Sequence, residues 1–171
     1  MNQRHARKFF PAIRRAIHRA RFGRAVLLLA ALGTAVAATY PNAFRTWTHV
    51  KSALITQTHP AAQSEGGLHH IYANAKAVEG YRSGQFPDGS TIVYELLETT
   101  EKNGVISEGA RRRVDVMIRD SERYKSTDGW GYERFMGAND SNNILDEAAA
   151  AQCHQCHSRA REHGSVFSRI R

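Results

Sequence analysis

Hydrophobic and polar positions follow two different periodicities along the chain, and the first is that of a helix. Apolar residues recur every three or four positions over residues 44–55, which predicts a helix on this segment. The polar, glycine-containing stretch over residues 59–67 predicts a loop after that helix. The apolar stripe consists of Phe44, Trp47, Val50, Ala53 and Leu54.

Beyond this loop, apolar and polar residues alternate in the pattern that is typical of β-strands. Runs rich in β-branched and aromatic residues predict strands over residues 68–73, 90–98, 113–119 and 130–135. Turn sequences separate the later strands, as Pro87-Asp88-Gly89, Lys102-Asn103-Gly104 and Thr127-Asp128-Gly129.

Two further segments predict helices on either side of these strands. Asn74 is suited to cap a helix over residues 75–82 that stops at Gly84. Asn142 or Asn143 is suited to begin a longer, alanine-rich helix over residues 144–162. Strands in the middle and helices at the ends predict an α+β fold, in which an antiparallel β-sheet has helices packed on it.

The first 38 residues have the pattern of an export signal. Eight Lys and Arg residues and no acidic residue occupy the first 24 positions, and an uncharged run follows over residues 25–38. This run is shorter than the roughly 20 apolar residues of a membrane-spanning helix. Small residues at its end predict cleavage near Ala38 and a periplasmic location. An uncleaved anchor is the alternative, and it would give the chain its contact with the membrane.

The positive net charge of the chain comes from this export segment. The formal net charge is +8, but eight of the 24 Lys and Arg residues belong to the export segment, and the other 16 balance 16 Asp and Glu. A neutral mature chain excludes a basic nucleic-acid-binding domain. The predicted organisation is therefore a signal over residues 1–38, a helix and loop over 39–66, and the main domain over 67–171.

The chain has two cysteines, and both stand in the sequence Cys153-His154-Gln155-Cys156-His157. This C-x-x-C-H pattern is the attachment motif of a c-type haem, in which the thiols bind the haem vinyl groups and the histidine ligates the iron. One covalent haem c is predicted, held by Cys153, Cys156 and His157, and an export route supports it. The last helix, over residues 144–162, would carry the motif.

Two other kinds of site use the same cysteines. A disulfide or thioredoxin-like redox pair is one alternative, although no βαβ pattern flanks the motif. A zinc site is the other, although a closed structural site needs four ligands and the chain has no second spaced pair of cysteines.

Further motifs resemble the cytochrome P-460 family and its close relative cytochrome c prime-beta. Their order and spacing match the family from about residue 40 to residue 171, nearly the whole mature chain. Only the haem motif is specific by itself. The other motifs support the resemblance through their combined order and spacing. They are Gly67-Leu-His-His-Ile-Tyr-Ala-Asn74, Phe86-Pro-Asp-Gly-Ser90, Tyr94-Glu-Leu96, Arg119-Asp-Ser-Glu-Arg-Tyr124, Asp128-Gly-Trp-Gly131 and Val166-Phe-Ser168.

The resemblance implies an antiparallel-sheet fold, a homodimer, and a c haem whose open sixth position faces the sheet. Relatives oxidise hydroxylamine or bind nitric oxide and other small gases. In cytochrome P-460 proper, a strand lysine forms a covalent bond to the haem macrocycle. Tyr94 stands at the matching position here. That lysine cross-link cannot form, which brings hydroxylamine oxidation into question and favours the cross-link-free cytochromes c prime-beta.

Strand periodicity allows a prediction of the haem pocket. If Tyr94 faces the haem, Ile92 and Leu96 share its side of the strand and the pocket is mostly apolar. Asp115 and Met117 share one face of the next predicted strand, opposite a more apolar face that predicts the core and leaves Asp115 in solvent. The resemblance instead implies that Asp115 replaces a pocket glutamate that handles protons. Tyr94 and Asp115 are the candidate catalytic residues.

Several other side chains have two interpretations each. Met117 either packs in the core or fills the sixth position of the iron. His69 and His70 lie on opposite faces of their strand, so at most one reaches the haem. The run Arg111-Arg112-Arg113 predicts a solvated strand end, or else pairing with haem propionates or a docking surface. His154 is predicted to be exposed, and Trp130, Tyr132 and Phe135 to pack on the sheet.

The sequence thus predicts an exported mono-haem c-type cytochrome, five-coordinate through His157, that binds or transforms small nitrogen oxides and has a redox partner. The alternative is a periplasmic electron carrier whose sixth iron position is filled. A hydroxylamine oxidase that uses another cross-link is a third reading.

Overall fold

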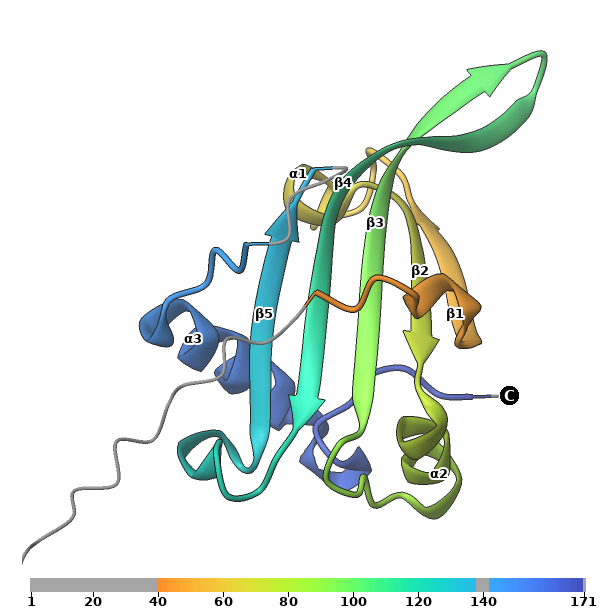
Figure 1. The fold of residues 1–171 in the computed structure, drawn as a ribbon. Coiled ribbons are helices and arrows are strands. Elements are labelled where there is room, and N and C mark those ends of the chain that lie inside the picture. Colours follow the sequence, from red (N-terminus) through yellow and green to blue (C-terminus); the bar gives the residue numbers. More distant parts are fainter. Residues whose placement is uncertain (1–39, 138–141, 171) are drawn as a thin grey trace, which may run out of the picture. The chain divides into compact units, whose positions relative to one another are not determined.

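The structure is a computed structural model that describes residues 40–137 and 142–170. Within these residues it contains one antiparallel sheet of five strands in the order β1-β2-β3-β4-β5 (Figure 1). The strands are β1 Thr48–Ile55, β2 Gly67–Ala73, β3 Thr91–Lys102, β4 Val105–Arg119 and β5 Trp130–Met136. The α-helices are α1 Ala62–Glu65, α2 Ala75–Ser83 and α3 Glu147–His157, and short 3₁₀ helices span Phe44–Thr46, Lys125–Thr127 and Ser158–His163.

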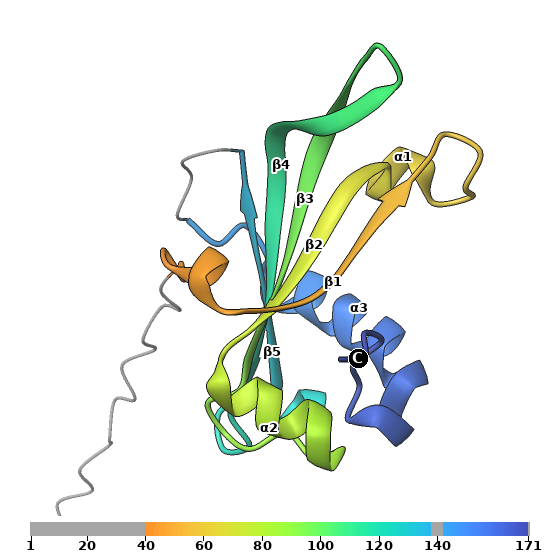
Figure 2. The same cartoon turned by 90° about the vertical axis from the view of Figure 1, so that its right-hand side faces the viewer.

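The sheet buries apolar side chains on both of its faces. Figure 2 shows the segment that leads into β1 on one side of the sheet, and α3 with the C-terminal residues on the other. The core under the leading segment consists of Phe44, Val93, Val114, Val116 and Phe135. The core on the side of α3 includes Val50, Ala73, Ala77, Val78, Ile92, Met117, Trp130, Tyr132 and Val166.

The α+β prediction is confirmed, including the antiparallel sheet and the C-terminal helix that contains Cys153 and Cys156. Helix α2 also begins as predicted, because the Asn74 side chain accepts a hydrogen bond from the backbone N–H of Ala77 at 2.9 Å. Residues 1–38, the predicted signal, lie outside the described residues. Within the described part of the chain, no helix combines the length and the apolar character needed to span a membrane.

The predicted helix over residues 44–55 is wrong. A 3₁₀ helix ends at Thr46, and the rest of the segment is the strand β1. The pairing of β1 with β2 shifts between His49 and Lys51, which marks a bulge in β1. A bulge adds one residue and changes the side on which later side chains point. The spacing of Trp47, Val50 and Ala53 therefore imitates a helix although the segment is extended.

The start of the last helix also differs from the prediction. Asp146 caps α3 by accepting a hydrogen bond from the N–H of Ala149 at 2.8 Å. The Asn143 side chain instead accepts from the backbone N–H groups of Arg134 and Leu145, at 2.9 and 3.0 Å. Asn143 thus ties the segment before α3 to β5, and the α-helix itself ends at His157, where a 3₁₀ turn begins.

Strands β3 and β4 are longer than predicted and form a hairpin that projects beyond the sheet (Figure 1). Residues 99–102 pair with residues 105–108, and Asn103 and Gly104 at the tip have φ values of 53° and 74°. Two consecutive left-handed residues of the Asn-Gly type favour a tight hairpin. The added residues are exposed on both faces, so their hydrophobic pattern gave no signal for a strand.

An ion pair between Arg45 and Glu95 fixes the segment before β1 to the sheet. Breaking this pair should lower the free energy of unfolding. The Arg45 guanidinium contacts both carboxylate oxygens of Glu95, at 2.9 to 3.2 Å, and the Glu95 side chain is fully buried. Removing one partner of a buried pair costs about 3–5 kcal/mol. Arg45 is 55% exposed and Arg111 remains 3.9 Å from Glu95, so we expect Arg45→Gln to lower the free energy of unfolding by about 2–3 kcal/mol.

Urea denaturation measures this loss. Lys125→Gln is the matched control, because the Lys125–Glu122 pair is exposed on both sides and should change stability by less than about 1 kcal/mol. Equal effects of the two substitutions would contradict the prediction.

Candidate haem site

Helix α3 presents the three residues of the predicted haem motif in its last turn and a half. Cys153 is half-buried, Cys156 is exposed, and His157 is the final residue of the helix. Both cysteines are free thiols, so they form no disulfide with each other in this structure. The helix packs against β5. This contact holds the motif against one face of the sheet.

A cavity of about 560 Å³ lies between this helix and the sheet. Its volume falls within the range of about 300–1,000 Å³ that is typical of small-molecule and cofactor sites. Cys153, Cys156 and His157 line it, and the sheet contributes residues of several strands. Those residues include Lys51, His69, Ile71, Ile92, Tyr94, Arg113, Asp115, Met117, Tyr132 and Arg134.

The hydrogen bonding of His157 defines which ring nitrogen is free. Its Nδ1 lies 2.9 Å from the backbone carbonyl oxygen of Ser165. Because a carbonyl can only accept, Nδ1 carries the hydrogen, and Nε2 keeps the lone pair that a metal needs. Burial lowers the pKa of His157, which also favours the neutral ring. The rings of Tyr132 and Phe167 lie 5.3 and 5.0 Å from it.

These residues fit a covalently held haem. Two thiols in C-x-x-C-H spacing and an imidazole with a free Nε2 line the same cavity, which is the donor set that a c-type haem requires. Within residues 40–137 and 142–170, no three His, Cys, Asp or Glu side chains form a group that could hold a metal ion. The zinc alternative therefore has no ligand set in the described part of the chain.

Comparison with protein families identifies the chain. The sequence profile of the family described as Cytochrome P460 matches residues 41–168. The chain belongs to the cytochrome P460 family. A comparison with curated proteins gives no match. In this family, the C-x-x-C-H spacing of Cys153 and Cys156 is consistent with covalent haem c.

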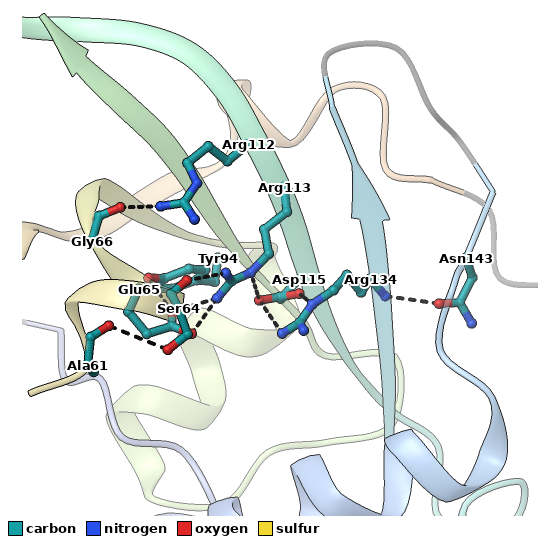
Figure 3. Close-up of polar contacts among 10 residues, drawn as sticks. All are labelled: Ala61, Ser64, Glu65, Gly66, Tyr94, Arg112, Arg113, Asp115, Arg134 and Asn143. Carbon is teal, nitrogen blue, oxygen red and sulfur yellow. Dashed lines mark hydrogen bonds and ion pairs between the residues drawn. The ribbon is translucent and has the colours of Figure 1, made fainter.

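The sheet wall of the cavity carries a row of charged and hydroxyl groups (Figure 3). The Tyr94 hydroxyl donates to Glu65 at 2.9 Å, and Arg113 donates to both oxygens of Glu65, at 2.5 and 2.6 Å. Arg113 also donates to Asp115 at 2.8 Å, and Arg134 donates to Asp115 from the far side at 3.1 Å. The wall is therefore less apolar than the sequence predicted.

Burial and neighbouring charges together shift the pKa values of Tyr94 and Glu65 in opposite directions. Burial raises the pKa of Tyr94, and the nearby Glu65 carboxylate raises it further, so the hydroxyl keeps its proton and acts as donor. Burial also raises the pKa of Glu65, but hydrogen bonds and charge from Arg113 outweigh it, and the pKa of Glu65 lies below its ordinary value of 4.5. Glu65 is therefore a carboxylate at neutral pH.

Asp115 lies in the cavity wall rather than in open solvent. Its side chain is 25% exposed, and its two oxygens are held by Arg113 and Arg134. This position agrees with the pocket placement that the family resemblance implied, and the prediction of a solvated Asp115 is wrong. Its role in proton handling stays a prediction, as does the catalytic role of Tyr94.

The paired histidines and Met117 are arranged as the strand pattern predicted. His69 lines the cavity and stacks on Tyr94, with ring centroids 4.9 Å apart. His70 points to the other face, where Ser52 and Glu108 lie 2.6 and 2.9 Å from its ring nitrogens. Met117 lines the cavity as a buried core residue. Tyr132, predicted as sheet packing, also lines the cavity, and its buried hydroxyl has no partner among the described residues.

Two predictions about charged residues are wrong. Arg113 is buried in the wall of the cavity instead of at a solvated strand end, and Arg111 and Arg112 donate to Tyr40 and to the Gly66 carbonyl. His154 is mostly covered, with its side chain 17% exposed and its Nε2 3.6 Å from Asp128. Each side chain is buried by a segment far from it in sequence, and the local pattern gives no sign of that segment.

Two functional residues were missed by the sequence analysis. Glu65 lies in a stretch predicted as a loop, and Arg134 lies on a strand whose aromatic residues dominated the interpretation. Only the register between β4 and β5, which places Asp115 opposite Arg134, brings that pair together. No signal in the sequence pointed to either residue.

Proposed function

We propose that this member of the cytochrome P460 family is an exported mono-haem c-type cytochrome that binds a small nitrogen oxide, such as nitric oxide, at an open iron position. The observation that carries the proposal is the shared cavity: Cys153, Cys156 and His157 line one wall, and the sheet forms the opposite wall. A haem in this cavity would be held by Cys153, Cys156 and His157, and residues of β3 and β4 would line the space around it.

The residues of α3 would hold the group. Cys153 and Cys156 would bind it through thioether bonds, and His157 would ligate the iron through Nε2, with its orientation fixed by the Ser165 carbonyl. When bound, a c haem supplies an iron that coordinates a small ligand and exchanges one electron.

The sheet residues would define the space for the ligand. Ile92 and Met117 exclude water from the middle of the wall, because both are buried and apolar. The Tyr94 hydroxyl donates a hydrogen bond to Glu65, which fixes the tyrosine side chain in the cavity wall. Asp115 lies within the same wall and would move a proton if the protein turns over a substrate. The tyrosine at position 94 supports ligand binding of the cytochrome c prime-beta type over hydroxylamine oxidation.

The setting of the protein is part of the proposal. The basic and apolar N-terminal segment supports export to the periplasm. The family resemblance supports a homodimer, and one-electron chemistry requires a redox partner, which we take to be another periplasmic protein.

Absorption spectra of the ferrous protein with and without carbon monoxide test the open position. We expect the gas to shift the main haem band, because a vacant sixth position binds it directly. An unchanged spectrum would contradict the proposal that the sixth iron position is open.

Met117 provides the control that separates this proposal from a six-coordinate electron carrier. The Met117 thioether on the cavity wall is a group that could fill the sixth position. We expect Met117→Leu to leave the carbon monoxide response as it is in the native protein. A response that appears only in Met117→Leu would show that Met117 occupies the iron and would favour the electron carrier.

A further inference from the structure

The carbonyl that receives the His157 hydrogen bond belongs to an unusual turn after α3. Gly164 and Ser165 both have left-handed backbone angles, with φ values of 66° and 64°. Ser165 is not glycine, and this conformation is unfavourable for a residue with a side chain. The residue is 3% exposed. Surrounding contacts must therefore hold the turn in place.

One of these contacts comes from the sheet. The indole Nε1 of Trp130 donates to the Gly164 carbonyl at 2.9 Å, and Trp130 is the first residue of β5. The indole is 2% exposed, with Phe86 packed edge-on at 5.4 Å and the Arg119 guanidinium 5.7 Å from the ring centre. Trp130 is thus a rigid donor fixed on the sheet.

A second cavity borders the turn on another side. Gly164 and Ser165 line this cavity of about 490 Å³ together with Trp130 and Phe86. Within the chain, the Ser165 N–H donates to the Ala160 carbonyl at 2.9 Å, which closes the turn on the preceding 3₁₀ helix. The bond from Trp130 links this local turn to the sheet.

We propose that Trp130 is a positioning residue for the iron ligand. It fixes the Gly164–Ser165 turn, and the turn aims the Ser165 carbonyl at the Nδ1–H group of His157. A metal-bound histidine that donates such a bond becomes a stronger electron donor to the metal. Trp130 would therefore act on a bound iron through the His157 imidazole. The inference rests on the proposed function in one respect, namely that His157 ligates a haem iron.

The test measures the haem-loaded protein with Trp130→Phe, which keeps an aromatic ring and removes the donor. A weaker hydrogen bond from His157 to the Ser165 carbonyl makes the imidazole a weaker electron donor and stabilises ferric iron less. The reduction potential should therefore become more positive. We expect a three- to tenfold change in the ferric/ferrous equilibrium, or about 30–60 mV for one electron. The iron–histidine stretching band in resonance Raman spectra of the ferrous protein should move to lower frequency.

Trp47→Phe is the matched control, because Trp47 packs against the core on the other face of the sheet. It should leave the potential and the stretching band unchanged. A haem-loaded Trp130→Phe protein with native values for both, or an equal shift in Trp47→Phe, would overturn the inference.

A second variant covers the case in which Trp130→Phe does not fold. Gly164→Ala keeps the indole but places a Cβ 2.8 Å from the Phe86 ring at a left-handed φ of 66°, so it strains the turn that carries the same carbonyl. The same direction of shift supports the inference, and native values refute it. Chains that carry no covalent haem at all, in the native protein as in the variants, would overturn the proposed function and the inference with it.

Discussion

Replacing both Cys153 and Cys156 by alanine is expected to abolish covalent haem attachment. The two thiols supply the only cysteine sulfurs of the chain, and both line the cavity. Without them, no thioether can form, although His157 still offers a ligand for a dissociable haem. Haem absorbance that stays with the chain under denaturing conditions should fall to background, and the mass of the purified chain should equal that of the polypeptide alone.

Gln155→Ala is the matched control within the same motif. Gln155 is exposed and occupies a variable position between the cysteines, so this variant should retain its haem in full. Haem that remains attached in the double cysteine variant would contradict the thioether assignment and point to another covalent link. The Tyr94 side chain would then be the first residue to test, because it lines the same cavity.

Removing the charge of Arg113 is expected to destabilise the protein strongly. Arg113 donates to Glu65, to Asp115 and to the Ser64 carbonyl, and its side chain is 9% exposed. Arg113→Leu would leave two carboxylates short of a partner inside the cavity wall. Breaking a buried pair costs about 3–5 kcal/mol, and because Arg134 still holds Asp115, we expect a loss of about 3 kcal/mol in urea denaturation at pH 7.

The pH dependence of this loss identifies the carboxylate involved. Burial raises the pKa of Glu65, but Arg113 outweighs it, so the folded pKa lies below the ordinary 4.5. A carboxylate with a lowered folded pKa adds stability that is complete above its unfolded pKa and is lost as the pH falls through the folded value. The native protein loses this contribution on acidification, whereas Arg113→Leu no longer has it. The stability difference between them should therefore narrow below about pH 4.

Two further experiments test whether the loss of stability comes from the ion pair between Arg113 and Glu65. Arg113→Lys retains the charge but not the two-pronged geometry, so it should lose less stability than Arg113→Leu. In a double-mutant cycle, Glu65→Gln and Arg113→Leu should not be additive, because the residues share one ion pair. Additive losses, or a gap that stays constant down to pH 3, would show that Arg113 acts through packing alone.

The fold could be predicted where local signals agree with the tertiary structure. Asn74 caps α2, the turn at residues 102–104 joins two strands, and the C-x-x-C-H motif lies on a helix, as expected. The helix expected over residues 44–55 failed because the bulge near His49 depends on pairing with β2. Local spacing carries no information on such pairing.

The site divides in the same way. By itself, the sequence predicted how a haem would be attached, because Cys153, Cys156 and His157 lie within five residues and their predicted roles depend on spacing within one helix. The resemblance to cytochrome P-460 also predicted that Tyr94 stands at the position of the cross-linking lysine, where a tyrosine cannot form that lysine bond. Both are statements about covalent chemistry, which residue identity fixes.

Only the tertiary structure decided what surrounds that attachment point. Glu65, Arg113 and Arg134 come from three separate elements and meet on the cavity wall through strand register and the position of α1. The contacts behind His157 arise in the same way, because the Ser165 carbonyl accepts from His157 and the Trp130 indole at the start of β5 donates to the neighbouring Gly164 carbonyl. Burial and hydrogen-bond partners arise from segments distant in sequence, so no local pattern can contain them.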